Sequence, residues 1–359
     1  MKRNLIFLIL IIPAFLNAQE YSQSKKDIKK SIEAHDKAVH IFHDWMRDPF
    51  ITLAPDGTYL LTATQHGETI DGRPCTNWAA PLYKSKNLAD WEFAGYYYDI
   101  SKDAANYKDY LARWGERKKR IKKEEPLKLW APEIHFINGN WHVLHTSNSG
   151  LGNFATTKGE KLESPYKAWN EKFHRQHDPS LFQDDDGSVY LVSRAAQIQK
   201  LNKDLTGFDG EPIKIGPSNR KIGHEGAYIL KIGEKYVLFG TAWSTDKMRH
   251  GTYNLYYCTA DKVDGPYGER KFAGRFLGHG TPFKDKQGRW WCTAFYNANK
   301  PTLNPYEAPK MDLSDTAYTI NKQGLTIVPL EVNIVDGDVV IRAKDEHYRY
   351  PGEEEVQKF

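Results

Sequence analysis

Hydrophobic and polar residues alternate along most of this chain in short runs that end at turn residues, a pattern typical of β-strands. The first unit starts at residues 47–50, turns at Asp56-Gly57 and returns as an apolar strand at residues 59–61. The same unit of strand, turn and returning strand occurs five times, and its turn glycines are Gly57, Gly139, Gly187, Gly233 and Gly288. We therefore expect five β-hairpins of one kind.

The five units keep a constant register. We align them at Asp48, Ala131, Asp178, Glu225 and Gly280, and each aligned residue stands 8 or 9 positions before the glycine of its own turn. Successive aligned residues are 83, 47, 47 and 55 positions apart. A repeat of about 50 residues with a hairpin in every unit is typical of a β-propeller, and unrelated hairpins in a sandwich would not keep this register. The pattern predicts an all-β, single-domain, five-bladed β-propeller over residues 41–359, with the first blade running from Ile41.

The long first spacing contains a charged insertion at residues 101–129. It has a helical pattern, and between Arg113 and Lys123 it holds seven basic residues against one acid. Because the insertion leads directly into Trp130, we expect it to lie at the rim of the face where the inner strands begin. Two interpretations stay open: a solvated helical face, or a basic rim that suits an anionic glycan.

The first residues have the features of a secretory signal peptide. Basic residues are followed by an apolar run and by a small residue, so we expect a signal peptide at residues 1–18. Gln19 stands where a lipoprotein would have cysteine. Residues 19–40 are polar and predict an N-terminal lead-in with a short helix. We expect a periplasmic or extracellular protein, since no later stretch is long and apolar enough to span a membrane.

Composition narrows the function classes. The net charge of +4 over 359 residues does not favour nucleic-acid binding, and aromatic residues make up 13% of the chain, which suits both sheet packing and sugar stacking. The three cysteines do not form a disulfide scaffold, and we expect Cys258 and Cys292 in the core. No cysteine or histidine spacing indicates a zinc site. A carbohydrate is the expected partner, and the oligomeric state stays open.

Three of the five aligned positions are acidic: Asp48, Asp178 and Glu225. Inner strands of a propeller start around one axis, so these carboxylates are expected to converge. Converging carboxylates raise one another's pKa and favour separate acid and base roles. A role as caps of strand starts accounts for one repeat but not for Glu225, which stands before a glycine.

The motifs at the strand starts resemble those of glycoside hydrolase family 43, and the likeness extends over about residues 40–300. The motifs are Arg47-Asp48-Pro49-Phe50, Trp130-Ala131-Pro132-Glu133, His177-Asp178-Pro179-Ser180, His224-Glu225-Gly226-Ala227 and Gly278-His279-Gly280-Thr281. The resemblance implies a five-bladed propeller that hydrolyses glycosidic bonds with inversion.

The resemblance also implies a role for each axial residue. Asp48 is then the general base that activates water, and Glu225 is the general acid that protonates the leaving oxygen. Asp178 is the third carboxylate, which raises the pKa of the acid and orients it. His279 is the axial histidine, which lies near a bound calcium ion or a water cluster in many members. No cofactor is required, and a structural calcium ion at the axis stays open.

Other residues are candidates for substrate binding. Trp130 and Trp243 offer aromatic rings that match the apolar face of a sugar. Arg194 follows the returning strand of the third unit. Arg47 and His224 stand directly beside Asp48 and Glu225.

The predicted function is hydrolysis of a plant or algal polysaccharide or its oligosaccharides. Two alternatives stay open. In one, the chain resembles glycoside hydrolase family 117 and His279 takes the acid role. In the other, the propeller binds glycans without catalysis, although a lectin has no need of three axial carboxylates.

Overall fold

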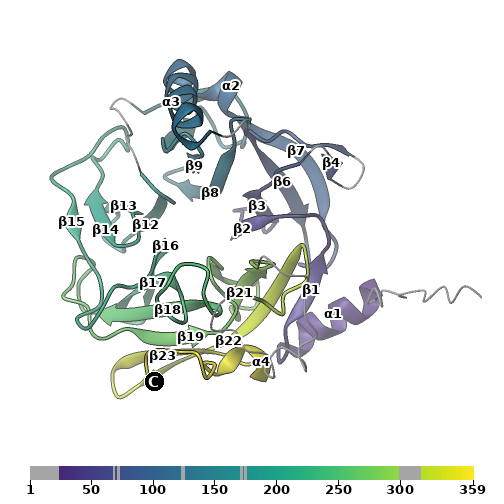
Figure 1. Cartoon of the computed structure of the whole chain (residues 1–359), viewed down its shortest axis with the longest axis vertical. Helices are drawn as coiled ribbons and strands as arrows, with labels where there is room; N and C mark the ends of the chain where they lie inside the picture. Colours follow the sequence, from purple (N-terminus) through teal and green to yellow (C-terminus); the bar gives the residue numbers. More distant parts are fainter. Residues whose placement is uncertain are drawn as a thin grey trace, which may run out of the picture.

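Five antiparallel sheets stand around a common axis in the computed structural model of the chain (Figure 1). The structure describes residues 24–67, 69–70, 73–122, 126–169, 173, 176–298 and 317–359. The expected signal peptide, residues 1–18, lies outside these ranges. Each sheet forms one blade, so the predicted five-bladed β-propeller is confirmed.

Blades 1 to 4 follow one another along the chain, each with four main strands. Blade 1 contains β2 (Arg47–Leu53), β3 (Tyr59–Thr64), β6 (Ala79–Ser85) and β7 (Glu92–Asp99), with a small ribbon of β4 (Thr69–Ile70) and β5 (Arg73–Pro74). Blade 2 contains β8 (Leu129–Ile137), β9 (Asn140–Ser147), β10 (Asn153–Thr157) and β11 (Tyr166–Ala168). Blade 3 contains β12 (Ser180–Gln183), β13 (Val189–Ser193), β14 (Gln197–Lys200) and β15 (Ile213–Lys214). Blade 4 contains β16 (Glu225–Ile232), β17 (Lys235–Trp243), β18 (Tyr253–Ala260) and β19 (Lys271–Gly274).

Blade 5 combines strands from both ends of the chain and closes the ring. It contains β20 (Pro282–Lys284), β21 (Trp290–Phe295), β22 (Leu325–Val335) and β1 (Val39–Phe42), and β23 (Asp338–Ala343) pairs with the second half of β22. The expectation that the first blade starts near Ile41 is therefore wrong: β1 pairs with β22, and blade 1 starts at Arg47. Pairing β1 with β22 covers an edge whose backbone groups would otherwise stay unpaired.

The insertion between blades 1 and 2 is helical, as expected. It forms α2 (Ile100–Asp103) and α3 (Tyr107–Ile121), which lie together beside blade 2 at the top of the view in Figure 1. Tyr110 and Trp114 of α3 are buried in the apolar cluster between blades 1 and 2. Two further helices, α1 (Lys25–Ala34) and α4 (Glu346–Arg349), lie near the two ends of the chain.

The core lies between neighbouring blades, where alternate side chains of each sheet face the next sheet. Leu60 from blade 1 and Val143 from blade 2 belong to one such cluster. Cys258 and Cys292 are fully buried, as expected. On the axis, the ring of Phe50 lies 6.4 Å from that of Tyr228 on blade 4. These aromatic rings fill the axis beside the residues with which the inner strands begin.

None of the helices in the described ranges combines the length and the apolar character that crossing a bilayer would need.

Closure of the ring can be tested at Ile41, which is 6% exposed and packs in one cluster with Leu325 and Ile327 of β22. We expect Ile41→Ala to lower the free energy of unfolding by about 2–4 kcal/mol, because it leaves a cavity in the closing blade. Lys37→Ala is the control, since Lys37 is exposed in the same segment. Chemical denaturation of both variants measures the difference; equal stability would contradict a closing role for β1.

Candidate active site

The backbone aims the three acidic side chains at the axis. Asp48, Ala131 and Asp178 all have left-handed backbone conformations, with φ of 49°, 43° and 43°. Pairing between the first two strands of blades 1, 2 and 4 shifts register at this point, which marks a β-bulge. Bulges re-aim side chains, and left-handed non-glycine residues are costly and gather at functional sites. Asp48 and Asp178 thus have a left-handed backbone, and Asp48 and Glu225 lie at bulges, at the points where their side chains turn toward the site.

His279 lies between the three carboxylates. Its Nδ1 atom is 3.1 Å from Oδ1 of Asp48 and 3.9 Å from Oε1 of Glu225, and its Nε2 atom is 3.8 Å from Oδ2 of Asp178. The two distances to Nδ1 allow at most about 7 Å between those Asp48 and Glu225 oxygens, which reaches only the lower end of the range of inverting glycosidases. The expected convergence of the carboxylates is confirmed.

Asp48 is held in its ionised form. Its Oδ2 atom accepts a hydrogen bond of 2.9 Å from Oγ1 of Thr64. Burial alone raises the pKa of Asp48, but the charge and hydrogen bond of His279 and the charge of Arg47 outweigh it and hold the pKa well below its usual range. An ionised carboxylate that stays ionised at low pH can accept a proton from water throughout the neutral range.

Glu225 is the most accessible of the three acids. Its side chain is 30% exposed, against 13% for Asp48 and 7% for Asp178. Its Oε1 atom accepts a hydrogen bond of 2.8 Å from the hydroxyl of Tyr253, and its Oε2 atom lies 3.3 Å from Nε2 of His177. This carboxylate can therefore meet a ligand that enters from solvent.

The protons are distributed differently from the sequence-based expectation. Burial raises the pKa of Glu225, but the hydrogen bond from His177 and the charge of His279 outweigh it and lower the pKa to about 2. Burial raises the pKa of Asp178 to about 6, although His279 and His177 oppose the shift. Oδ2 of Asp178 has no hydrogen-bond partner among the described residues, which explains why its charged form is the less stabilised one. The charge of Glu225 is among those that raise the pKa of Asp178, so the two carboxyl groups interact, and Asp178 keeps its proton to the higher pH.

The charge of His279 follows from its position. Burial lowers its pKa, but the charges of Asp48, Asp178 and Glu225 together raise it to about 10. The ring lies against the Cα atom of Gly226, where an added Cβ would stand 2.8 Å from Cδ2 of His279. Gly226 also has a φ of 65°. A glycine at this position therefore keeps the imidazole in the centre of the carboxylates.

Two of the expected substrate-binding residues share a pocket on the same face. Arg194 and His224 line a cavity of about 1300 Å³ between blades 3 and 4. Arg194 follows the end of β13 and His224 precedes β16, so both stand at the level of the carboxylates. Trp130 is partly exposed at the start of β8. These positions suit contacts with a long substrate.

The other two candidates contact the protein. Arg47 donates a hydrogen bond of 2.8 Å from Nη2 to Oδ1 of Asn297 and adds positive charge beside Asp48. Trp243 is only 4% exposed, and its ring stacks on Tyr253 at a centroid distance of 4.4 Å. The expected sugar-stacking role of Trp243 does not agree with this burial; the residue instead supports the tyrosine that binds Glu225.

Sequence reasoning gave no role to His177 or Tyr253. His177 lies within the quoted motif, so its neighbour Asp178 was a signal that could have found it. Tyr253 lies on the third strand of blade 4, and nothing in its local sequence distinguishes it from the other aromatic residues of β18. Its contact with Glu225 depends on the pairing of β17 with β18.

Among the described residues, one set of side chains could hold a metal ion. The donor atoms of His177, Asp178 and Glu225 lie within 4.8 Å of one another. Calcium takes six to eight oxygen ligands, and a protonated imidazole cannot be a ligand. A calcium ion at the axis, near His279, therefore stays a prediction.

A five-bladed propeller with three carboxylates and two histidines at its axis has the architecture and the charged groups of a glycoside hydrolase. The sequence profile of the glycosyl hydrolases family 43 matches residues 41–312. The chain belongs to this family.

Two relatives are each about a quarter identical to the chain over the aligned residues. A probable arabinan endo-1,5-α-L-arabinosidase A of Emericella nidulans is 25% identical over 180 residues, which cover 43% of this chain and 55% of that protein. The extracellular exo-α-(1->5)-L-arabinofuranosidase ArbA of Cellvibrio japonicus is 24% identical over 279 residues, which cover 68% of this chain and 72% of that protein. The chain thus spans little more than half of the first relative.

Solved structures agree on the fold. An endo-1,4-β-xylanase of Bacteroides thetaiotaomicron superposes with a TM-score of 0.56 at 17% identity, covering 84% of this chain and 94% of the other. An endo-arabinase of the same organism superposes with a TM-score of 0.53 at 20% identity, covering 82% and 96%.

The contact between Gly226 and His279 can be tested with a matched pair of substitutions. Gly226→Ala and Gly187→Ala both place a Cβ on a left-handed glycine, but nothing lies within 4 Å of the Cβ position of Gly187. We expect both variants to lose about 1 kcal/mol of stability. Only Gly226→Ala should also lose activity, at least tenfold, because it pushes His279 out of place. Equal activity in both variants would contradict the role of this contact.

Proposed function

We propose that the chain hydrolyses a plant or algal polysaccharide, or its oligosaccharides, with inversion of the anomeric carbon. The observation that carries this proposal is the meeting of Asp48, Asp178 and Glu225 around His279 in a family 43 propeller. The names of the relatives support arabinan- or xylan-type substrates, which are plant polysaccharides.

Asp48 acts as the general base. Its low pKa keeps it ionised, and its hydrogen bond with Thr64 orients it. A water molecule beside Asp48 loses a proton to the carboxylate as its oxygen attacks the anomeric carbon. The bond between this carbon and the leaving oxygen breaks on the opposite face of the sugar.

Glu225 acts as the general acid and delivers a proton to the leaving oxygen. In the free protein Asp178 holds a proton more readily than Glu225, because His177 stabilises the charge of Glu225. The side chain of His177 is 46% exposed, so a sugar that enters the site can displace it from Glu225. Loss of this contact raises the pKa of Glu225, and the proton of the pair moves to the carboxyl group that faces the leaving oxygen.

His279 is the second candidate for the acid. Its raised pKa makes it an imidazolium at neutral pH, which supplies a proton within reach of the site. Its side chain is only 11% exposed and lies among the carboxylates, which favours a positioning role instead. We assign it the task of holding the three charges together.

We also propose that the protein acts in the periplasm or outside the cell. The apolar run at residues 5–16 and the extracellular relative from Cellvibrio japonicus support this location.

The roles can be separated with three variants on a panel of polysaccharides and aryl glycosides. We expect Asp48→Asn and Glu225→Gln each to reduce kcat/KM on a polysaccharide by about 10²–10⁴-fold. A dinitrophenyl glycoside should restore much of the activity of Glu225→Gln but not of Asp48→Asn, since its leaving group needs no proton. NMR of the first product should show the inverted anomer.

Other outcomes of this experiment change the assignment. Activity that survives in Glu225→Gln but is lost in His279→Ala, with rescue by the same aryl glycoside, moves the acid role to His279. Glycan binding without hydrolysis of any substrate would overturn the enzymatic proposal.

The protonation of the acid pair generates a prediction on pH dependence. The pair is active with one proton bound, and the charge of His177 favours loss of that proton. His177→Ala should therefore move the alkaline limb of the kcat/KM profile to higher pH, by about one unit. A limb that stays in place, or moves to lower pH, would show that His177 does not control the pair.

A further inference from the structure

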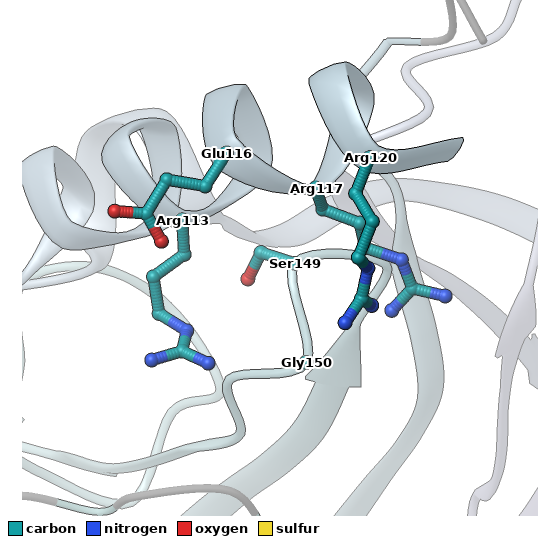
Figure 2. Close-up of a pocket in the computed structure, with 6 residues that line it drawn as sticks. All are labelled: Arg113, Glu116, Arg117, Arg120, Ser149 and Gly150. Atoms are coloured by element: carbon teal, nitrogen blue, oxygen red, sulfur yellow. The ribbon is translucent and has the colours of Figure 1, made fainter. Parts of the chain in front are cut away.

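A pocket of about 320 Å³ lies between helix α3 and the loop after β9 (Figure 2). Six residues line it: Arg113, Glu116, Arg117, Arg120, Ser149 and Gly150. In Figure 2 the three arginine side chains extend from the helix toward the loop that carries Ser149. The pocket lies apart from the axial carboxylates, and the proposed reaction does not use it.

The arginines form one stripe on the helix. Positions 113, 117 and 120 are separated by four and three residues, so they lie on one face of α3. Like charges at this spacing repel one another. No ion pair joins any of the three to a carboxylate among the described residues, although Glu116 lines the same pocket. Within the part of the chain that the structure describes, the helix thus concentrates positive charge on this face that no ion pair neutralises.

The pocket contains buried donors that lack acceptors. The Nε atoms of Arg113 and Arg117 are buried, and neither has a hydrogen-bond partner in the part of the chain that the structure describes. Buried donors are almost always paired in proteins, because leaving them unpaired is costly. A solvated helical face explains the exposed Lys119 but not these two buried atoms. They indicate that the pocket is shaped for an acceptor.

The walls of the pocket are held in place on both sides. Tyr110 is fully buried, and its hydroxyl donates a hydrogen bond of 2.9 Å to the carbonyl of Gly152, which ties the helix to the loop. Ser149 is 4% exposed and shares a hydrogen bond of 2.7 Å with Ser147. A Cβ at Gly152 would stand 2.9 Å from the carbonyl oxygen of Gln176, just before His177. The loop therefore lies between α3 and the segment that carries Asp178.

The pocket is on the same face as the carboxylates. The backbone N–H of Asn148 donates to the carbonyl of Lys128, directly before β8. Three residues further on, the N–H of Ala131 donates a bond of 2.7 Å to Thr64, whose hydroxyl binds Asp48 at 2.9 Å. A glycan bound at Asp48 and Glu225 can thus extend over the rim that α3 forms.

We propose that this arginine pocket binds an oxyanion carried by a sugar of the substrate, so that the chain acts on an anionic glycan. The inference rests on the proposed glycosidase function and deepens it. Arginine presents a planar fork of donors that matches a carboxylate or a sulfate in two parallel hydrogen bonds. The bound oxyanion is either the carboxylate of a uronic acid or the sulfate group of a sulfated sugar. Both accept paired hydrogen bonds from arginine.

The test compares matched substrates in wild type and variants. Each uronic-acid oligosaccharide is paired with its carboxyl-reduced form, and each sulfated one with its desulfated form. We expect Arg117→Ala to raise KM for the anionic member of one pair about ten- to a hundredfold, with kcat nearly unchanged. KM for the neutral member should not change. The pair that responds identifies the group as carboxylate or sulfate.

Lys119→Ala is the matched control, because it removes the same charge from an exposed position outside the pocket. Arg117→Lys keeps the charge without the fork and should recover only part of the affinity. Arg120→Ala serves as a second variant if Arg117→Ala does not fold, since Arg120 is exposed and lines the same pocket. Circular dichroism checks the fold of each variant.

Calorimetry with Asp48→Asn separates this inference from the proposed function, because binding is then measured without turnover. Binding of an anionic oligosaccharide that weakens with Arg117→Ala in this background supports the pocket even if no variant hydrolyses a glycan. Three results would overturn the inference: no preference of the wild type for an anionic member, equal weakening by Lys119→Ala, or equal weakening for the neutral member.

Discussion

The ion pairs of His279 with three carboxylates at the axis are the interaction on which the site depends. Asp48, Asp178 and Glu225 come from three blades, and their charges would repel one another at the axis without a cation among them. Buried charges are tolerated only when they are paired. The imidazole lies where it does because Gly226 leaves room for its ring. The fold thus assembles a negative site that remains stable without its substrate.

The propeller provides the frame for this charge cluster. Each inner strand starts at the axis, and in blades 1, 2 and 4 a bulge at that start turns one side chain inward. Closure of the ring by β1 and β22 fixes the position of every blade relative to its neighbours. The blades contribute different residues to the axial site. Three supply acids, one supplies His279, and one supplies Ala131 together with the helical insertion that precedes it.

The helical insertion breaks the symmetry of the rim. Its buried residues Tyr110 and Trp114 join the core between blades 1 and 2, while its arginines face a pocket of their own. The axial site is negative and this part of the rim is positive. A glycan with anionic groups is therefore repelled at the axis and attracted at the rim of the same face. Opposite charge on the rim also offsets the repulsion that such a glycan meets at the axis.

The sequence by itself determined the propeller and its three acids, because equivalent positions of a repeat occupy equivalent places around an axis. It also indicated His279, which stands next to the aligned Gly280. Only the tertiary structure decided that β1 belongs to blade 5, that Tyr253 and His177 bind Glu225, and that the raised pKa belongs to Asp178. Those features arise from contacts between residues far apart in the chain, and local patterns carry no record of such contacts.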